Sequence, residues 1–223
     1  MNAFQIKVIA IIAMLVDHIG LFLFPHYLFF RIIGRLAFPL FAWLIANGAH
    51  HTHSMGNYLK RLYFFALLSQ IPFLLANQLL DPKFSDLNVI CTLFFGLFAI
   101  ALIQRTNNWA LWFLITVVFS ALAELLQTDY GGFGVAVIVL FYLFFYNFKK
   151  LVIAQIMLFM APFILFPVYL SGLFEPIGLL SLYFVRSYNG QPGPRAKYLF
   201  YIIYPLQYVV FYLLLRGLLA NTI

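Results

Sequence analysis

The chain has 223 residues, of which 65% are hydrophobic and only 9% are charged, and its mean hydropathy is +1.00. Soluble domains carry roughly one-quarter charged residues, so this composition excludes a soluble globular protein and predicts a polytopic membrane protein. The net charge of +7 does not indicate a nucleic-acid partner, because the Lys and Arg residues lie mostly between apolar runs. The single cysteine, Cys91, excludes an internal disulfide framework and a CxxC redox or zinc motif.

Apolar runs separated by polar residues predict an all-α protein with about nine transmembrane helices embedded in a lipid bilayer. In chain order they cover approximately residues 4–24, 28–48, 58–80, 87–103, 109–126, 132–148, 151–170, 174–188 and 197–219. The first run is interpreted as a retained helix, because it lacks a small-residue cleavage pattern and further spans follow it. No internal repeat or linker is present, so residues 1–223 are predicted to form a single domain.

The positive charges predict how the chain is oriented in the membrane. With a cytoplasmic N-terminus, nine of the thirteen basic residues fall on the cytoplasmic side, as Lys and Arg do in membrane proteins. These are Lys7, Lys60, Arg61, Arg105, Lys149, Lys150, Arg186, Arg195 and Lys197. The acidic residues then lie in the outer half of the membrane or beyond it: Asp17, Asp81, Asp86, Glu124, Asp129 and Glu175. We therefore expect the N-terminus in the cytoplasm and the C-terminus outside.

Two ionisable residues, Asp17 and His18, lie inside the first apolar run. Ionisable groups within a membrane are costly to bury and usually functional. Adjacent residues point about 100° apart on a helix, so we expect one of them to face a cavity and the other to contact a neighbouring helix. His18 suits a general base, because the ordinary pKa of histidine lies near neutrality. The structural alternative is a hydrogen-bonded histidine beside an Asp–Arg pair that joins two helices.

Arg31 and Arg35 lie four residues apart and so share one face of the second predicted helix. Gly34 between them allows a neighbouring group to approach the backbone. A helical rise of ~1.5 Å per residue places Asp17 and Arg35 at similar depth. Arg31 or Arg35 is therefore a candidate partner for Asp17, and we expect the pair with Arg35. Two guanidinium groups also suit an oxyanion or a phosphate, whereas the alternative is that they extend to the outer surface.

The segment from His50 to His53 contains three histidines, but neighbouring histidines rarely direct three nitrogens at one metal ion, so no metal is expected. With Lys60 and Arg61 it forms a basic cytoplasmic face, which suits a phosphate-rich cofactor or is simply solvated. Polar residues also occur inside later spans, where they either hydrogen bond between helices or line a cavity. They include Ser69, Gln70, Asn88, Thr92, Tyr204 and Gln207.

Several sequence blocks, in order over nearly the whole chain, resemble the TraX family. They are LVDHIG at 15–20, RIIGRLAFPLFA at 31–42, NG at 47–48 followed by HHT at 50–52, YLKRL at 58–62, FALLSQIPF at 65–73, DYG at 129–131 and YNG at 188–190. Asn88 with Thr92 and Tyr204 with Pro205 continue the match. The chain departs from the family pattern at two positions, where Asn47 replaces an expected glutamate and Gln207 replaces an expected histidine.

The TraX family is known for N-terminal acetylation of a conjugative pilin, and it is similar to transmembrane acyltransferases such as heparan-glucosaminide acetyltransferase. The resemblance implies an acetyltransferase of the bacterial cytoplasmic (inner) membrane. Its donor would be cytoplasmic acetyl-CoA, and its acceptor would be an amine or hydroxyl of a protein, peptide or carbohydrate at the outer side. The catalytic residues implied are His18 as the base, Asp17, and Arg35 as a partner of the thioester or oxyanion.

The residues that the resemblance associates with acetyl-CoA are drawn from the basic face, the second helix and the polar positions of later spans. They are Arg31, Asn47, His50, His51, Tyr58, Lys60, Arg61, Gln70, Asn88, Thr92, Lys197 and Tyr204. Two other classes of function stay open. One is a small proton-coupled transporter or permease, in which the buried charges form a relay, although transporters commonly show internal repeats. The other is a non-catalytic membrane protein of pilus assembly.

Overall fold

A computed structural model describes residues 1–165, 175–194 and 198–220 of the chain. Within these ranges the regular structure is helical and contains no strand, which confirms the all-α prediction. The helices are α1 (Ala3–Leu23), α2 (Leu28–Gly34), α3 (Ala37–His51), α4 (Met55–Gln78), α5 (Val89–Ile103), α6 (Trp109–Leu125), α7 (Gly131–Leu143), α8 (Phe148–Leu165), the 3-10 helix η2 (Glu175–Leu180), α9 (Ser181–Arg186) and α10 (Leu199–Ala220).

Four segments of the described chain are long and apolar enough to cross a membrane: Ala3–Leu23, Leu28–His51, Met55–Gln78 and Tyr201–Leu218. Helices α5, α6 and α7 are also apolar but shorter, with 15, 17 and 13 residues. The predicted span at 28–48 corresponds to α2 and α3 together, and the span at 174–188 corresponds to η2 and α9. Parts of three predicted spans, at residues 166–170, 174 and 197, lie outside the described residues.

Asparagine caps fix where several helices begin. At α1, the Asn2 side chain accepts a hydrogen bond from the Gln5 backbone N–H at 2.9 Å, and the Gln5 side chain accepts one from the Asn2 N–H at 3.0 Å. This reciprocal capping box satisfies two N–H groups that would otherwise lack partners. Asn88 caps α5 in the simpler way, through the Ile90 N–H at 3.0 Å. Such caps give definite starts to helices whose composition is almost uniformly apolar.

The second predicted span, 28–48, lies within the single candidate membrane span Leu28–His51, but a short irregularity separates its two helices, α2 and α3. Proline at position 39 has no N–H and therefore leaves the carbonyl of Arg35 without its usual helical donor. The chain turns at Arg35 and Leu36 before α3 begins. The freed Arg35 carbonyl lies against Gly178 of η2, where an added Cβ would be 3.2 Å from it. The break thus brings Arg35 close to the start of η2.

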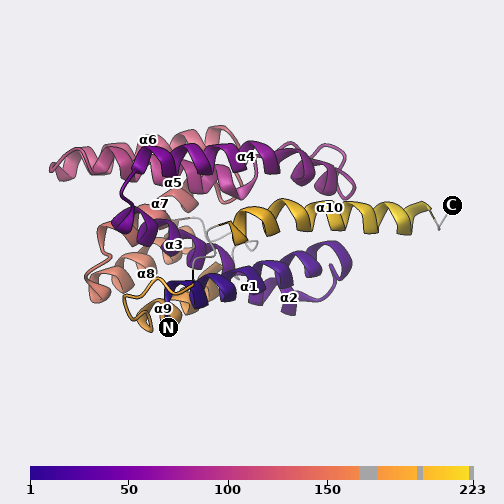
Figure 1. Cartoon of the computed structure of the whole chain (residues 1–223), viewed down its shortest axis with the longest axis horizontal. Helices are drawn as coiled ribbons and strands as arrows, with labels where there is room; N and C mark the ends of the chain where they lie inside the picture. Colours follow the sequence, from indigo (N-terminus) through magenta and orange to yellow (C-terminus); the bar gives the residue numbers. More distant parts are fainter. Residues whose placement is uncertain (166–174, 195–197, 221–223) are drawn as a thin grey trace.

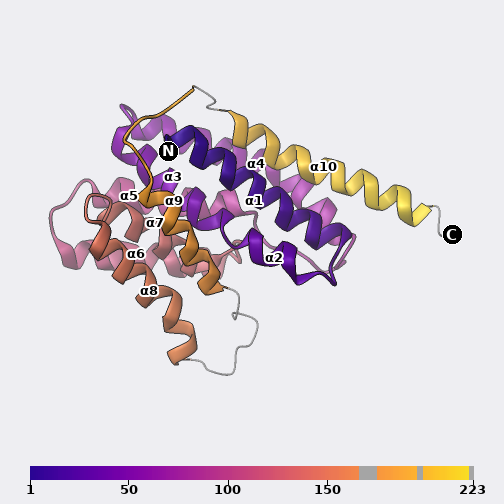
Figure 2. The ribbon, with the colours of Figure 1, turned by 90° about the horizontal axis from the view of Figure 1, so that it is seen from below.

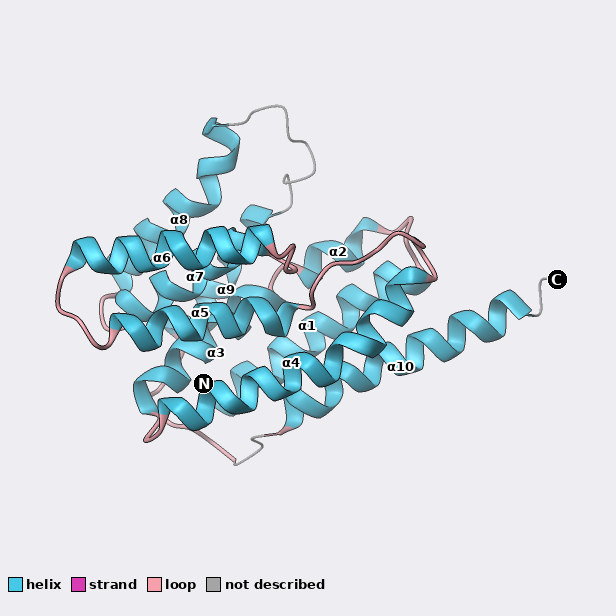
Figure 3. Ribbon diagram, turned by 90° about the horizontal axis from the view of Figure 1, so that it is seen from above, coloured by secondary structure: helices cyan, strands magenta, loops and turns pink. Residues whose placement is uncertain are grey.

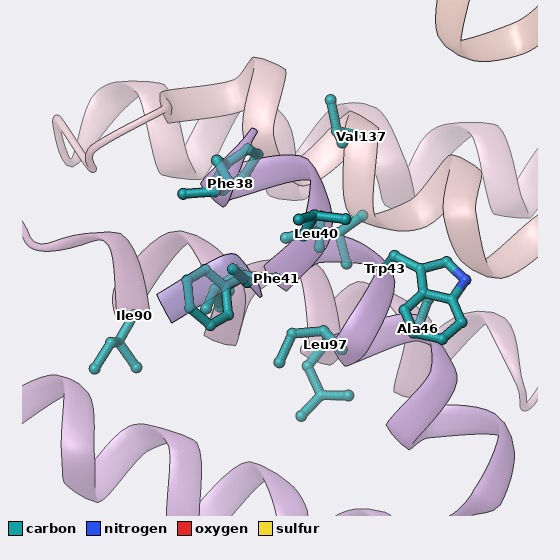
Figure 4. Close-up of a cluster of buried hydrophobic side chains, with 14 of the residues drawn as sticks. Phe38, Leu40, Phe41, Trp43, Ala46, Ile90, Leu97 and Val137 are labelled. Carbon is teal, nitrogen blue, oxygen red and sulfur yellow. The ribbon is translucent and has the colours of Figure 1, made fainter. Parts of the chain in front are cut away.

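Helix α3 is the centre of the fold. Ten of its fifteen residues are buried, and it packs against α1, α5 and α7. Figure 4 shows side chains of α3, among them Phe38, Leu40 and Trp43, packed with residues of α5 and α7. Close packing of this kind leaves little room for change in side-chain volume. The α3 backbone is therefore held firmly in place.

Several of the other helices form two groups within the bundle. Helices α4, α10 and α1 run side by side along the long axis, and α10 extends beyond the other two (Figure 1). Helices α5, α6 and α7 form the second group (Figure 3). The outward faces of α4 and α10 carry exposed apolar side chains, including Phe64, Leu67, Ile71, Val210 and Leu213. Apolar surfaces of this extent suit contact with lipid.

The N-terminus lies beside the loop that follows α9, as Figure 2 shows. The Ala3 N–H donates to the Gln191 carbonyl at 2.9 Å, and the Asn189 N–H donates to the Met1 carbonyl at the same distance. Both segments were assigned to one side of the membrane from the positive charges. Their contact in the structure agrees with that assignment.

Candidate functional site

Two cavities lie inside the helix bundle. The first, here called the cationic cavity, has a volume of about 700 Å³ and is lined by the beginnings of α1, α4 and α10, the end of α3 and residues 192–194. The second, here called the acidic cavity, has a volume of about 390 Å³ and is lined by the second half of α1, the α2–α3 break, η2, α4, α10 and the loops before α5 and α7. The candidate site comprises both.

Four of the six acidic residues of the chain line the acidic cavity: Asp17, Asp86, Asp129 and Glu175. Two of them form salt bridges with the arginines of the second span. Arg31 Nη1 lies 2.9 Å from Asp17 Oδ2, and Arg35 Nη1 lies 2.8 Å from Glu175 Oε1. The expected pair between Asp17 and Arg35 is therefore wrong, because the helix break directs Arg35 toward η2 and leaves Arg31 opposite Asp17.

Gly34 explains how Asp17 reaches the second span. A Cβ at position 34 would lie 2.0 Å from Asp17 Oδ1 and 2.4 Å from Asp17 Cβ, which real side chains do not tolerate. The absence of a side chain lets the carboxylate rest directly on the α2 backbone. The expectation that Gly34 permits close approach to this backbone is confirmed, and the approaching group is Asp17.

His18, the next residue of α1, contacts α10. Its Nε2 lies 3.0 Å from the hydroxyl oxygen of Tyr208, and the two rings are 5.0 Å apart. Phe22, Phe73 and Tyr204 surround Tyr208, with ring centroids 5.2–5.9 Å from it. We expected one of the two residues to face a cavity and the other to contact a neighbouring helix. In the structure both Asp17 and His18 line the acidic cavity, and each also contacts a neighbouring helix.

The turn before α7 also contributes to the acidic cavity. Tyr130 adopts a left-handed backbone conformation, with φ of 66°, and its ring stacks on Phe38 at 3.9 Å between centroids. A non-glycine residue held in this conformation stores strain, which surrounding contacts must offset. Thr92 supports the turn, because its hydroxyl donates to the Asp129 carbonyl. Burial raises the pKa of Asp129 to about 6, an effect that the Asp17 carboxylate strengthens and the Arg31 and Arg35 guanidinium groups oppose.

The predicted cofactor residues Gln70, Asn88 and Thr92 line neither cavity. Asn88 is fully buried, and its Nδ2 donates to Gln70 Oε1 at 2.7 Å and to the Ala66 carbonyl at 2.8 Å. Gln70 in turn donates to the Asp86 carbonyl at 2.9 Å. These bonds join α4 to the start of α5 and hold Asp86 at the acidic cavity. Gln70 and Asn88 therefore support the cavity wall without lining it.

Among the described residues that line the cationic cavity are two cations and no acidic side chain. Lys7 and Arg61 both line it, and the Arg61 guanidinium lies 5.0 Å from the centre of the Tyr58 ring. Asn47 and His51 complete the set of predicted cofactor residues found here. Among the described residues, neither cation forms a salt bridge, and positive charge in a partly enclosed space favours an anionic ligand, particularly a phosphate.

The other predicted residues are divided between the cavities and the surface. Arg31 and Tyr204 line the acidic cavity. His50 lies outside both, because its ring stacks on Tyr142 at 4.3 Å and its Nε2 lies 3.1 Å from the Tyr142 carbonyl. Lys60 is exposed and also lines neither cavity, and Lys197 lies outside the described residues. Over the described ranges, no three His, Cys, Asp or Glu side chains group as metal ligands.

Several cavity residues had no functional role predicted from the sequence, among them Lys7, Asp86, Asp129, Glu175 and Tyr208. Lys7 and Glu175 are charges within or beside apolar runs, which is the signal that identified Asp17. Asp129 occurs in a block that matches the family, but its glycine-rich surroundings favoured a simple turn. Tyr208 carries no sequence signal, because tyrosine is common throughout the chain.

The fold and the site define an all-helical protein of membrane type, in which apolar helices enclose two polar cavities. The chain belongs to the TraX family, whose model, described as TraX protein, matches residues 3–215. The resemblance observed in the sequence blocks is thereby confirmed.

Two curated relatives match the chain. It is 33% identical over 230 aligned positions to the probable fimbrial assembly protein FimC, serogroup H1, of Dichelobacter nodosus, with 92% of each chain covered. It is 30% identical over 91 positions to the uncharacterized protein RP591 of Rickettsia prowazekii (strain Madrid E), which covers 41% of this chain and 33% of that protein. No solved structure matches the chain.

Proposed function

We propose that the protein is an acetyltransferase of the bacterial cytoplasmic membrane, with a cytoplasmic N-terminus and nine membrane-crossing segments. It transfers an acetyl group from cytoplasmic acetyl-CoA to an amine or hydroxyl at the outer side. The observation that carries the proposal is the pair of cavities of opposite charge inside one bundle, one lined by Lys7 and Arg61 and the other by a histidine beside acidic groups and arginines.

Acetyl-CoA fits the cationic cavity by its chemistry. The ribose phosphate and the diphosphate of CoA carry several negative charges, which Lys7 and Arg61 would bind. The aromatic ring of Tyr58 and the imidazole of His51 supply further contact surface. The slender pantetheine arm would extend from this cavity toward the acidic cavity and carry the thioester to His18.

The acidic cavity supplies the groups that acyl transfer requires. The acceptor nitrogen or oxygen attacks the thioester carbonyl carbon and forms the new bond, while His18 takes the proton that the acceptor loses. The Tyr208 oxygen then accepts a hydrogen bond from the protonated His18 ring, and the Arg35 guanidinium faces the transient oxyanion. When the carbon–sulfur bond breaks, CoA leaves as a thiolate. The thiolate takes up the proton held by His18 and becomes a free thiol, which restores the neutral His18 ring.

The acceptor is proposed to be a subunit of a pilus or fimbria. The relative from D. nodosus is named a probable fimbrial assembly protein, which supports a role in this process. An amine at a pilin N-terminus would enter the acidic cavity as a cation, and carboxylates such as Asp86 and Asp129 would attract it. Gln207, in place of an expected histidine, lies beside His18, so His18 would act without a second titrating ring there.

The experiment that tests the proposal measures free thiol release from acetyl-CoA by the purified protein, with and without pilin peptides. We expect His18→Ala to lower turnover by about 10²–10⁴, the usual contribution of a positioned proton acceptor, while CoA affinity stays nearly unchanged. His26→Ala is the matched control, because His26 is exposed and lines neither cavity. Full activity of the His18→Ala variant would contradict the mechanism, and absence of any turnover would contradict the proposal.

A second pair of variants tests the donor site. We expect Arg61→Ala to weaken CoA binding, and added salt to narrow the difference from the unsubstituted protein, because Arg61 acts through charge on phosphates. Lys60→Ala is the control, since Lys60 is the neighbouring cation but lies outside the cavity. Equal losses in the two variants would show that general surface charge, rather than the cavity, attracts CoA.

A non-catalytic role in pilus assembly is the second candidate, and the name of the D. nodosus relative favours it equally. In that case the salt bridges of Asp17 with Arg31 and of Arg35 with Glu175 simply join helices. The two candidates differ in cells. A folded His18→Ala protein that restores pilus formation as well as the unsubstituted protein favours the assembly role, whereas failure to restore it favours catalysis.

A further inference from the structure

The two cavities lie one beyond the other along the same helix faces. On α1, Lys7 lines the cationic cavity, and Met14, two helical turns further on, lines the acidic cavity. On α10, Tyr201 and Tyr204 are divided between the cavities in the same way. A ligand that extended along these faces would pass directly from one cavity into the other.

Phe41 of α3 is the one described residue that lines both cavities. One turn before it, Phe38 lines the acidic cavity, and one turn after it, Ile45 lines the cationic cavity. The Phe41 side chain is only 7% exposed, and it extends from the closely packed central helix (Figure 4). Its ring therefore lies at the boundary between the two spaces.

We propose that the Phe41 ring is the partition between the cavities and the element that turns aside when a ligand passes between them. A bulky apolar ring excludes water and ions from a narrow passage, whereas rotation about its side-chain bonds needs no change in the α3 backbone. The identity of the passing group as the pantetheine arm of acetyl-CoA rests on the proposed function. The separation of the two cavities by Phe41 is independent of that function.

The partition is tested by thiol labelling from each side of the membrane. In a Cys91→Ala background, Ala37→Cys places a thiol in the acidic cavity and Asn57→Cys places one in the cationic cavity. An anionic, membrane-impermeant methanethiosulfonate reagent is added to inside-out or right-side-out vesicles. The face on which Asn57→Cys reacts identifies the cationic side, whichever orientation the protein adopts.

With Phe41 in place, we expect the reagent to label Ala37→Cys slowly from the cationic side. Phe41→Ala should raise that rate toward the rate of Asn57→Cys, and Phe41→Leu, which keeps part of the bulk, should raise it less. Phe119→Ala is the matched control, because Phe119 is similarly buried, at 9% exposed, but lines neither cavity. If Phe41→Ala fails to fold, the comparison of Phe41→Leu with Phe119→Leu replaces it.

An unchanged labelling rate after removal of the ring would overturn the partition, and so would rapid labelling from the cationic side with Phe41 present. Thiol release from acetyl-CoA, measured on the unsubstituted protein, separates this result from the proposed function. Turnover without a change in labelling refutes the partition alone. A Phe41-dependent change in labelling without any turnover refutes the acetyltransferase alone.

Discussion

Replacement of Gly34 by alanine tests the contact that holds α1 against the second span. The added methyl group would lie 2.0 Å from Asp17 Oδ1, 2.3 Å from Asp17 Cγ and 2.4 Å from Asp17 Cβ. All three atoms belong to the residue that forms the salt bridge with Arg31. The variant must therefore either move the carboxylate away from Arg31 or separate the two helices.

The magnitude follows from overpacking at a partly buried pair. Insertion of one methyl group into a well-packed contact costs about 1–3 kcal/mol. The Asp17 and Arg31 side chains are 17% and 30% exposed, so loss of their ion pair adds only a modest cost. For a chain of this size, each kcal/mol lowers the melting temperature by about 2–4 °C. We expect Gly34→Ala to melt about 2–12 °C below the unsubstituted protein by the same conversion.

The assay is thermal unfolding of the purified protein in detergent, with Gly56→Ala as the matched control. A Cβ at Gly56 would meet nothing within 4 Å, and alanine is the better helix former by about 0.5–1 kcal/mol, so this variant should melt no lower than the unsubstituted protein. Asp17→Gly, combined with Gly34→Ala, removes all three clashing atoms, and the double variant should lose less than the sum of the single losses. Equal melting of Gly34→Ala and Gly56→Ala would refute the reasoning.

Two further predictions concern the charges of the acidic cavity. Arg35→Met and Glu175→Gln should couple by about 0.5–3 kcal/mol in a double-mutant cycle of unfolding. This coupling should exceed that of Arg35→Met with Asp17→Asn, because the 2.8 Å salt bridge joins Arg35 to Glu175. Equal coupling energies in the two cycles would contradict the assigned pairs. The folded protein binds a proton at Asp129 more tightly than the unfolded chain, since the pKa rises from 3.8 to about 6. Stability should therefore fall as pH rises through this interval, and Asp129→Asn should reduce that fall in melting curves recorded at several pH values, whereas an unchanged pH profile would argue against the buried carboxylate.

The sequence predicted the helices well because apolar runs and polar breaks are local signals. The run predicted at 109–126 is α6, Trp109–Leu125, and the run at 4–24 is α1, Ala3–Leu23. The role of Gly34 was also predictable, since a small residue between two arginines indicates close approach. Local pattern and residue size carried these inferences.

The partners within the site could not be predicted in the same way. The choice between Arg31 and Arg35 as the partner of Asp17 depends on the irregularity between α2 and α3, where Pro39 removes a helical hydrogen bond. The contact of His18 with Tyr208 joins residues 190 positions apart, a separation at which helix periodicity gives no information. Glu175 becomes a partner of Arg35 only because η2 packs beside the break. Tertiary packing, rather than local propensity, determines these pairs.

The opposite charges of the two cavities make the bundle an electric dipole. The cationic cavity has Lys7 and Arg61 without acids, whereas the acidic cavity has four acids against two arginines. In the proposed orientation the positive end faces a cytoplasm that an energised membrane keeps negative. A charge that crosses the whole potential gains about 2.3 kcal/mol per 100 mV, so the resting potential favours this orientation of the folded bundle. The acetyl group itself is uncharged, and its passage from one side to the other does no work against the field.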